Sequence, residues 1–474
     1  MWLNFIRDQK NQEIILFALV ICLASFLRFH LLPGNMPFIG DQAKDFFVAR
    51  DMVEKGTVPL LGIESSQPQF RQGPLYIWLL AVHFALFGYG VENTGYLAAS
   101  IGILAVGMLY IYGRRYFGRR TALYAAALLA VSPLAVAHSQ LAFIINPIPL
   151  LSVGYLMSLL AYTKRTSMSL FWPAIWFGLL FQCELAGAPL IILLPVAVWL
   201  KQTKISRYMV VPTLQGLVLG LLPQIIYDLT HGFRQLGLFA VWVGYRIAAF
   251  GGYKDNLTVS AQSLFNVSAT IKLYLHRILT GNEVLYFILG LTLLSGLYFW
   301  LTLPKKSASP VSLVWWWILL LLGSYVIHGV PSEAYFPALF VPLSLALGWT
   351  FSQVQSANGR LLAPLLVGII MAANTHFIVA TPSTAWLPRL STQQEVVDLI
   401  KTHVGSPIRL RSIGPGSQFP AFLDNFRYLL WYNDIKVSDD GEPVWLVFGP
   451  EKSSPPLINM KSFVFDDLTV SLPL

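Results

Sequence analysis

The sequence has little charge and almost no cysteine, and both shortages narrow the class of protein. Asp, Glu, Lys and Arg make up only 12% of its 474 residues, whereas they make up about 25% of an average soluble domain. A soluble protein of this length needs more charge to cover its surface. The two cysteines, Cys22 and Cys183, lie far apart in apolar runs and indicate no disulfide framework.

Apolar residues are in excess, at 55% of the chain, which excludes intrinsic disorder. They gather in runs of about 15–22 residues, the length with which a helix crosses a bilayer. We therefore predict a polytopic α-helical membrane protein with about eleven spans. The predicted spans are 13–32, 93–112, 121–137, 147–163, a hairpin of two short spans in 170–200, 208–226, 284–303, 311–329, 334–352 and 361–380.

The basic residues indicate how the spans are oriented. The net charge is +9, and in a membrane protein Lys and Arg collect in cytoplasmic loops rather than marking a nucleic-acid partner. The arginines of 114–120 lie inside only if the apolar run 74–89 does not cross, so we expect this run to lie along the outer face. The N-terminus is then inside, and a cleaved signal peptide is the alternative interpretation of the first run. The predicted outer segments are 33–92, 227–283 and the tail 381–474.

The tail predicts a second domain because its composition differs from the rest. It is polar and rich in Ser, Pro and Asp. The expected helices are 391–404 and 418–433, and the expected strands are 408–413, 444–449 and 462–466. We expect a small α/β domain of residues 381–474 on the outer face, attached to a membrane domain of residues 1–380.

Ionisable residues are nearly absent from the spans and collect at their outer ends, first of all in 40–62. Asp41 follows the first span and is either the N-cap of the next helix or a functional carboxylate. Residues 42–54 predict an amphipathic helix at the interface. Its expected lipid side carries Phe46, Phe47 and Val53, and its expected water side carries Lys44, Asp45, Arg50 and Asp51.

Further polar residues stand in the other outer segments. Arg71 precedes Gly73-Pro74 and either contacts a phosphate or extends to the lipid surface. Glu184 tops the hairpin of 170–200, where a carboxylate is costly unless it is paired or functional. The short outer turns add His138, Gln140 and Asn146, which are alternatively helix caps, and also His328, Glu333 and Tyr335.

These motifs, in this order, resemble the GT-C superfamily of membrane glycosyltransferases. The resemblance covers about 1–380 and is nearest to the protein O-mannosyltransferase and aminoarabinose (lipid A) transferase group. The motifs that carry it are Gly40-Asp41-Gln42, Gly73-Pro74-Leu75-Tyr76 and Glu333-Ala334-Tyr335-Phe336-Pro337. The group usually has Asp-Glu at the first motif, and this chain has Gln42 in second place. A two-carboxylate metal site is therefore not expected, nor is any other cofactor.

The resemblance implies that a sugar passes from a polyprenyl-phosphate donor to a hydroxyl of a protein, lipid or glycan acceptor. Asp41 would be the general base of a direct, inverting displacement at the outer face of a cytoplasmic (inner) membrane. Fixed cations and donors would stabilise the departing phosphate. The candidates for that role are Lys44, Arg71, His328, Tyr335 and Arg246. The candidates for binding the sugar or the acceptor are Gln42, Glu184, Gln140, Asn146 and Glu333.

Three other functions fit the same composition. A multi-pass transporter or flippase of lipid-linked sugars would share the lipid partner, but its polar residues should line a path through the bilayer. A transferase of phosphate-bearing head groups, or a glycan ligase, could use the same outer carboxylate. A membrane anchor that displays the tail would leave the polar outer turns unexplained. The concentration of polar residues at one face favours the glycosyltransferase.

Overall fold

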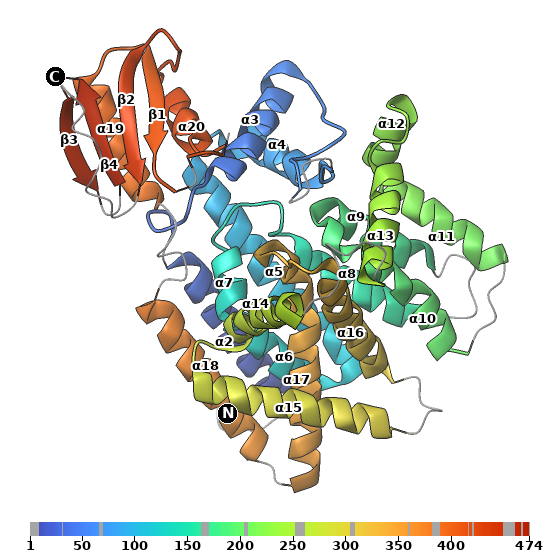
Figure 1. Cartoon of the computed structure of the whole chain (residues 1–474). Coiled ribbons are helices and arrows are strands. Elements are labelled where there is room, and N and C mark those ends of the chain that lie inside the picture. The colour runs from blue at the N-terminus through green and yellow to red at the C-terminus, as the bar shows by residue number, and fades with distance from the viewer. Residues whose placement is uncertain are drawn as a thin grey trace.

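A computed structural model of the chain shows a helical membrane part and a small C-terminal domain (Figure 1). It describes residues 9–30, 32–65, 70–162, 170–202, 207–251, 261–303, 309–358, 361–381, 389–415, 417–419, 421–448, 460–465 and 468–473. Arg165, Lys305 and Arg360, basic residues that the predicted orientation also places inside, lie outside the described residues.

The elements follow one another along the chain as labelled in Figure 1. The first helices are α2 Gln9–Phe29, α3 Gly40–Lys55, α4 Leu75–Phe87, α5 Val91–Phe117, α6 Arg119–Ala130, α7 Pro133–His138, α8 Ile148–Ala161, α9 Phe171–Cys183, η2 Leu185–Ile192 and α10 Leu193–Leu200. The next are α11 Arg207–Gly220, α12 Leu222–Thr230, α13 Leu236–Phe250, α14 Ala261–Leu279, α15 Glu283–Thr302, α16 Pro310–His328, η4 Glu333–Tyr335, α17 Pro337–Asn358 and α18 Leu362–Ala380. The C-terminal domain contains α19 Leu390–His403, β1 Ile408–Ile413, α20 Asp424–Tyr432, β2 Glu442–Phe448, β3 Met460–Phe465 and β4 Leu468–Pro473.

The apolar helices make the chain a multi-pass membrane protein, as the sequence predicts. Within the described residues, six helices are long and apolar enough to cross a membrane, namely α2, α5, α15, α16, α17 and α18. Helices α11 and α12 form a seventh candidate together, although the chain bends by 79° between them. The other predicted spans are shorter, since the 14 residues of α8 extend for only about 21 Å. The count of eleven and the orientation stay predictions.

Three local features of the membrane part differ in detail from the sequence patterns. The run 121–137 divides into α6 and α7, because Pro133 lacks a backbone N–H and suits only the first turn of a helix. The segment 170–200 breaks at Glu184, where α9 ends and the 3₁₀ helix η2 begins, close to the expected turn. The outer segment 227–283, for which no helix was expected, contains α13 and α14.

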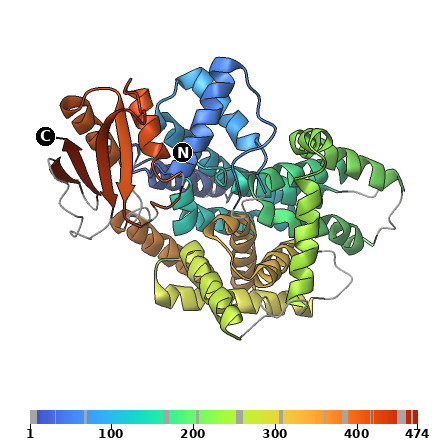
Figure 2. The same cartoon turned by 45° about the horizontal axis from the view of Figure 1, so that its top comes forward.

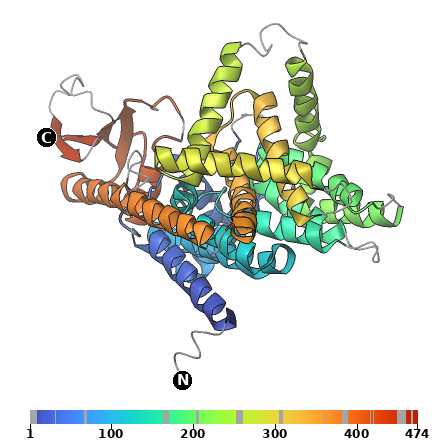
Figure 3. The same ribbon diagram turned by 90° about the horizontal axis from the view of Figure 1, so that it is seen from below.

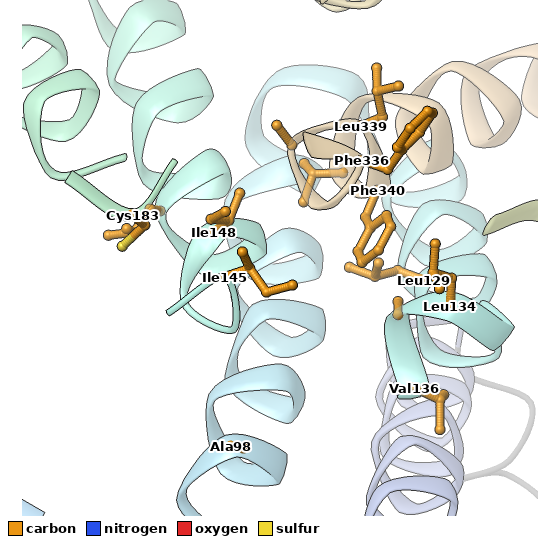
Figure 4. Close-up of a cluster of buried hydrophobic side chains, with 14 of the residues drawn as sticks. Ala98, Leu129, Leu134, Val136, Ile145, Ile148, Cys183, Phe336, Leu339 and Phe340 are labelled. Atoms are coloured by element: carbon orange, nitrogen blue, oxygen red, sulfur yellow. The ribbon is translucent and has the colours of Figure 1, made fainter. Parts of the chain in front are cut away.

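The core of the membrane part lies where α5, α6, α7, α8 and α17 meet. Figure 4 shows buried side chains of this region, and each of the five helices contributes one of Ala98, Leu129, Leu134, Ile148 and Phe340. Helix α17 is central, since 83% of its most apolar stretch is buried inside the protein. The corresponding share for α15 is only 17%. Seen from below, α15 and α18 lie across the surface of the molecule (Figure 3). Their exposed apolar faces are typical of helices that contact lipid.

The C-terminal domain is an α/β unit, as expected, with one strand more than the sequence analysis assigned. Its sheet has the order β1-β2-β4-β3. Strands β1 and β2 pair in parallel, and β4 pairs antiparallel to both β2 and β3. The unassigned strand β4 buries alternate residues Leu468, Val470 and Leu472. The helix expected over 418–433 begins only at Asp424.

The C-terminal domain docks on the segment that leads into α3, and Figures 1 and 2 both show α20 beside that helix. The carbonyl oxygen of Phe38 accepts hydrogen bonds from Gln393 Nε2 at 2.8 Å and from Asn425 Nδ2 at 3.2 Å. The hydroxyl of Tyr428 donates to the carbonyl of Tyr89 at 2.9 Å. Its ring also lies edge-on to Phe46 of α3. The two parts of the chain are therefore joined by specific polar contacts.

Candidate active site

Helix α3 presents Asp41 to solvent. The N-cap of α3 is Ile39, whose backbone N–H donates to Gln42 Oε1 at 2.8 Å, so the interpretation of Asp41 as the cap is wrong. Gly40 leaves no room for a side chain, because a Cβ atom there would lie 1.7 Å from the carbonyl oxygen of Ala421. The backbone before Asp41 is thus pressed against the C-terminal domain, and the Asp41 side chain itself is exposed.

The expected water side of α3 is wrong for Asp45, which is completely buried. Phe46, expected to face lipid, is buried as well and packs against Phe38, Phe84 and Tyr428. Because the C-terminal domain and α4 cover this helix, the stripe through Gln42, Asp45 and Ala49 faces protein. An amphipathic helix at a lipid surface would have left the charged residues in water.

The Asp45 carboxylate is unusual because nothing in the described part of the chain hydrogen-bonds to it. Both of its oxygens are buried and unpartnered there. Burial and the neighbouring charge of Asp41 raise the pKa of Asp45 well above its usual value, while Arg71 and Lys44 oppose that shift. These influences place Asp41, Lys44 and Arg71 around one buried acid. Two of the predicted phosphate ligands and the predicted base therefore all act on the same buried acid.

A second group of predicted residues shares a small cavity between η2, α13 and the end of α16. The cavity has a volume of about 50 Å³, and its lining includes Glu184, His328 and Tyr335. The Tyr335 hydroxyl lies 3.4 Å from His328 Nε2. Glu184 Oε1 accepts from the backbone N–H of Ala186 at 2.9 Å, which fixes the carboxylate at the cavity wall.

Arg246 of α13 stands beside this cavity. Its guanidinium lies 5.7 Å from the centre of the Trp242 ring and donates to the carbonyl oxygen of His328. Trp242 itself lines the cavity and contacts the His328 ring, with ring centres 5.7 Å apart. A positive charge is thus held beside the aromatic wall of the cavity, where it attracts an anion.

The segment 70–72 joins the two groups. Phe70 lines the cavity and lies edge-on to Trp242. The backbone N–H of Arg71 donates to Gln235 Oε1 at 2.9 Å, and Gln72 Nε2 lies 3.5 Å from Glu184 Oε2. Arg71 therefore stands between the buried Asp45 and the wall that carries Glu184. Its side chain is exposed.

Glu333 faces away from the cavity toward α7 and α14. Its carboxylate lies 2.9 Å from His138 Nε2 and 3.7 Å from Arg277 Nη1. Burial alone would raise the pKa of Glu333, but the hydrogen bond and charge of His138 and the charge of Arg277 lower it below its usual value. The geometry connects three helical segments, and it does not bring Glu333 to His328 and Tyr335.

Gln42, Gln140 and Asn146 are buried and hydrogen-bonded to the backbone. Gln42 donates to Ala142, and Gln140 donates to Leu27, each at 3.1 Å. Asn146 donates to the carbonyls of Ala98 and His138. These amides join loops to helices, and the structure brings none of them to the cavity lining. Their binding of sugar or acceptor stays a prediction.

Several residues of the site were not singled out in the sequence. Trp242 and Gln235 lie in an outer segment that gave no motif, and Gln72 was only a neighbour of Arg71. Asp45 had a usable signal, because Gln42, Asp45, Phe46 and Ala49 recur at helical spacing on one face. The apolar members of that stripe indicate burial for the polar ones as well.

Two comparisons of the sequence with known proteins bear on this arrangement. Residues 71–227 match the family of dolichyl-phosphate-mannose-protein mannosyltransferases. This stretch contains Arg71 and Glu184 but neither Asp41 nor the C-terminal domain. No curated protein matches the chain significantly in sequence.

Solved structures match over nearly the whole chain. ArnT from Cupriavidus metallidurans bound to undecaprenyl phosphate is 13% identical, with a TM-score of 0.61 and coverage of 97% of both chains. The oligosaccharyltransferase of Archaeoglobus fulgidus, in complex with Zn and sulfate, is 12% identical with a TM-score of 0.54 and covers 91% of this chain and 68% of its own. At these identities the likeness concerns the fold. The predicted resemblance to the GT-C membrane glycosyltransferases is confirmed by the family match and by the fold together.

Proposed function

We propose that the protein transfers a sugar from a polyprenyl-phosphate donor to an acceptor hydroxyl at the outer face of the membrane. The observation that carries the proposal is the buried, unpartnered Asp45, on which the charges of the exposed Asp41 and of the two cations Lys44 and Arg71 all act. ArnT, whose fold this chain resembles, binds undecaprenyl phosphate in its crystal structure. The acceptor would be a protein, a lipid or a glycan.

Asp41 would act as the general base. The acceptor hydroxyl must lose its proton as its oxygen attacks the anomeric carbon, and an exposed carboxylate on a fixed helix can accept that proton. The attack forms the new C–O bond while the bond to the lipid phosphate breaks, so a single displacement inverts the anomeric centre. Gly40 and Phe38 hold the start of α3 against the C-terminal domain, which keeps Asp41 in place.

The leaving phosphate gains negative charge as the bond to the sugar breaks. Fixed cations at that position stabilise the transition state more than the ground state. Lys44 and Arg71 would meet this charge from the side of Asp41, and Arg246, His328 and Tyr335 from the cavity. We further propose that no metal ion takes part, since the first motif has Gln42 where a second carboxylate would stand.

The cavity must enlarge to admit a substrate. Its volume of about 50 Å³ equals only one or two water molecules of about 30 Å³ each. Substrate entry therefore requires the segment 70–72 or α13 to move away from η2. Such movements of lining segments are common in enzymes that exclude water during group transfer.

The test is a transfer assay with purified protein, a panel of polyprenyl-phosphate sugars and hydroxyl acceptors. Asp41→Asn should lower the rate by roughly 10²–10⁴-fold with donor affinity almost unchanged, because the amide keeps the shape but loses the basicity. The matched control is Asp51→Asn on the same helix, whose carboxylate pairs only with Arg50 and Lys55 in the described residues. A rate above about half of the wild-type rate in Asp41→Asn would reject the base.

A further inference from the structure

The largest cavity that we describe lies at the opposite end of α9 from the candidate active site. It has a volume of about 680 Å³ and is lined by α5, α8 and the first turns of α9. The 13 residues of α9 extend for about 20 Å, so its start at Phe171 is far from Glu184. Neither the proposed base nor any proposed phosphate ligand lines this cavity.

Arg115 gives the cavity its charge. Its neighbours Arg114 and Arg119 each form an ion pair with Glu13. Arg114 Nη1 lies 3.6 Å and Arg119 Nε lies 3.2 Å from the oxygens of that carboxylate. Arg115 is exposed, lies 5.8 Å from the centre of the Tyr116 ring, and has no ion pair among the described residues. Its charge is therefore available to an anion at the mouth of the cavity.

The walls of the cavity are built from aromatic and apolar side chains. Trp172 and Tyr112 are 60% and 47% exposed, which is typical of the aromatic residues that lie at a membrane–water interface. Trp176 packs directly on α8 because Gly154 has no side chain, and a Cβ atom there would lie 2.6 Å from the indole ring. The result is an apolar recess with one cation at its edge.

We propose that this cavity binds an anionic phospholipid of the cytoplasmic leaflet. The predicted orientation places the arginines of 114–120 on that side, where anionic head groups attract basic pockets between membrane helices. The phosphate would lie on Arg115, and the acyl chains would follow the wall of Trp172 and Trp176. A volume of about 680 Å³ falls within the usual range of about 300–1,000 Å³ for ligand sites.

The bound lipid would join α5 to the hairpin that carries Glu184. The cavity is lined by α5, α8 and the first turns of α9, so a bound lipid would contact all three helices. A ligand that binds only the folded protein raises its stability with concentration. The proposal does not depend on the transfer reaction, so an inactive Asp41→Asn protein should bind the lipid equally well.

The test uses the full chain in detergent, with phosphatidylglycerol and phosphatidylcholine added separately. Native mass spectrometry should show at least tenfold more bound phosphatidylglycerol, and the melting temperature should rise with phosphatidylglycerol alone. Arg115→Gln should abolish this preference. The matched control Arg120→Gln, an exposed arginine of the same cluster that does not line the cavity, should keep it.

Three results would overturn the proposal. The first is equal binding of both lipids by the wild-type protein, which needs no variant to be informative. The second is an undiminished preference in Arg115→Gln. The third is displacement of phosphatidylglycerol by equimolar undecaprenyl phosphate in Asp41→Asn, which would assign the cavity to the polyprenyl lipid instead.

Discussion

Two buried carboxylates, at opposite ends of the membrane part, have contrasting surroundings. Glu13 of α2 accepts a hydrogen bond from the Tyr110 hydroxyl and lies within ion-pair distance of Arg114 and Arg119. Asp45 of α3 has no hydrogen-bond partner in the described residues, although Lys44 and Arg71 lie near. A paired buried charge connects helices, whereas an unpaired one costs stability and persists where function requires it. The Asp45 cluster (Asp45, Lys44 and Arg71) should therefore serve the reaction, and the Glu13 cluster (Glu13, Arg114 and Arg119) should serve the fold.

The largest effect is expected when a cation of the Asp45 cluster is removed, and this variant tests the contrast most strongly. Arg71→Gln should lower the transfer rate by about 10²–10³-fold, the usual effect of losing one donor to a developing negative charge. The melting temperature should hardly change, because the Arg71 side chain is exposed. The measurement is the rate at saturating donor, with exposed Arg411→Gln as the control. An unfolded Arg71→Gln protein would show that the Asp45 cluster serves the fold instead.

A substitution in the Glu13 cluster should lower the stability of the protein and leave the transfer rate almost unchanged. Glu13→Gln removes the charge that Arg114 and Arg119 share and should lower the free energy of unfolding by about 1–3 kcal/mol, the scale of an unsatisfied buried group. The transfer rate per folded molecule should stay within about twofold of wild type, a barrier change below about 0.5 kcal/mol. Chemical unfolding in detergent, compared with Glu92→Gln in the first turn of α5, measures the loss. A large rate defect without a stability defect would contradict the assignment.

Replacing the Asp45 carboxylate by an amide should instead increase the stability of the protein. Asp45→Asn replaces a buried acid by a neutral amide of equal size, which avoids burying a charge near pH 8, and should raise the free energy of unfolding there by on the order of 1 kcal/mol, the scale of one pKa unit. The folded carboxyl has the higher pKa, so between the unfolded and folded pKa values the folded protein binds more protons. Wild-type stability should consequently fall as pH rises through that window. Melting temperatures from pH 4 to pH 8 test this, and a parallel pH dependence in Asp45→Asn would refute it.

The smallest expected effect is that of a chelator. If Lys44 and Arg71 supply the positive charge at the leaving phosphate, EDTA should leave the transfer rate within about twofold of its untreated value. The assay is repeated after dialysis and after addition of Mg²⁺, Mn²⁺ or Zn²⁺. A loss that one of these ions restores would disprove the proposed independence from metals.

The fold class was accessible from the sequence because long apolar runs report directly on the bilayer. The resemblance was accessible because its motifs are short and local, such as Gly73-Pro74 and Glu333-Ala334-Tyr335. The burial of Asp45 was not, because α20, far along the chain, covers α3 through Tyr428. The partner of Glu333 was missed for the same reason, since Arg277 belongs to a helix that no motif marked. Contacts between distant segments decided each of these errors.

The two side-chain amides on the Phe38 carbonyl constrain how the enzyme can open. Gln393 and Asn425 also bond to each other, at 2.7 Å, so three residues close a small ring at the base of α3. Tilting α3 outward would break that ring, and the buried amides of Gln393 and Asn425 would lose the Phe38 carbonyl as their acceptor. The helix of Asp41 and the C-terminal domain should therefore move as one unit, and we expect the segment 70–72 and α13 to move when a substrate enters. The site would then open from one side only. The cavity wall of α13 would move, while Asp41 on α3 would stay in place.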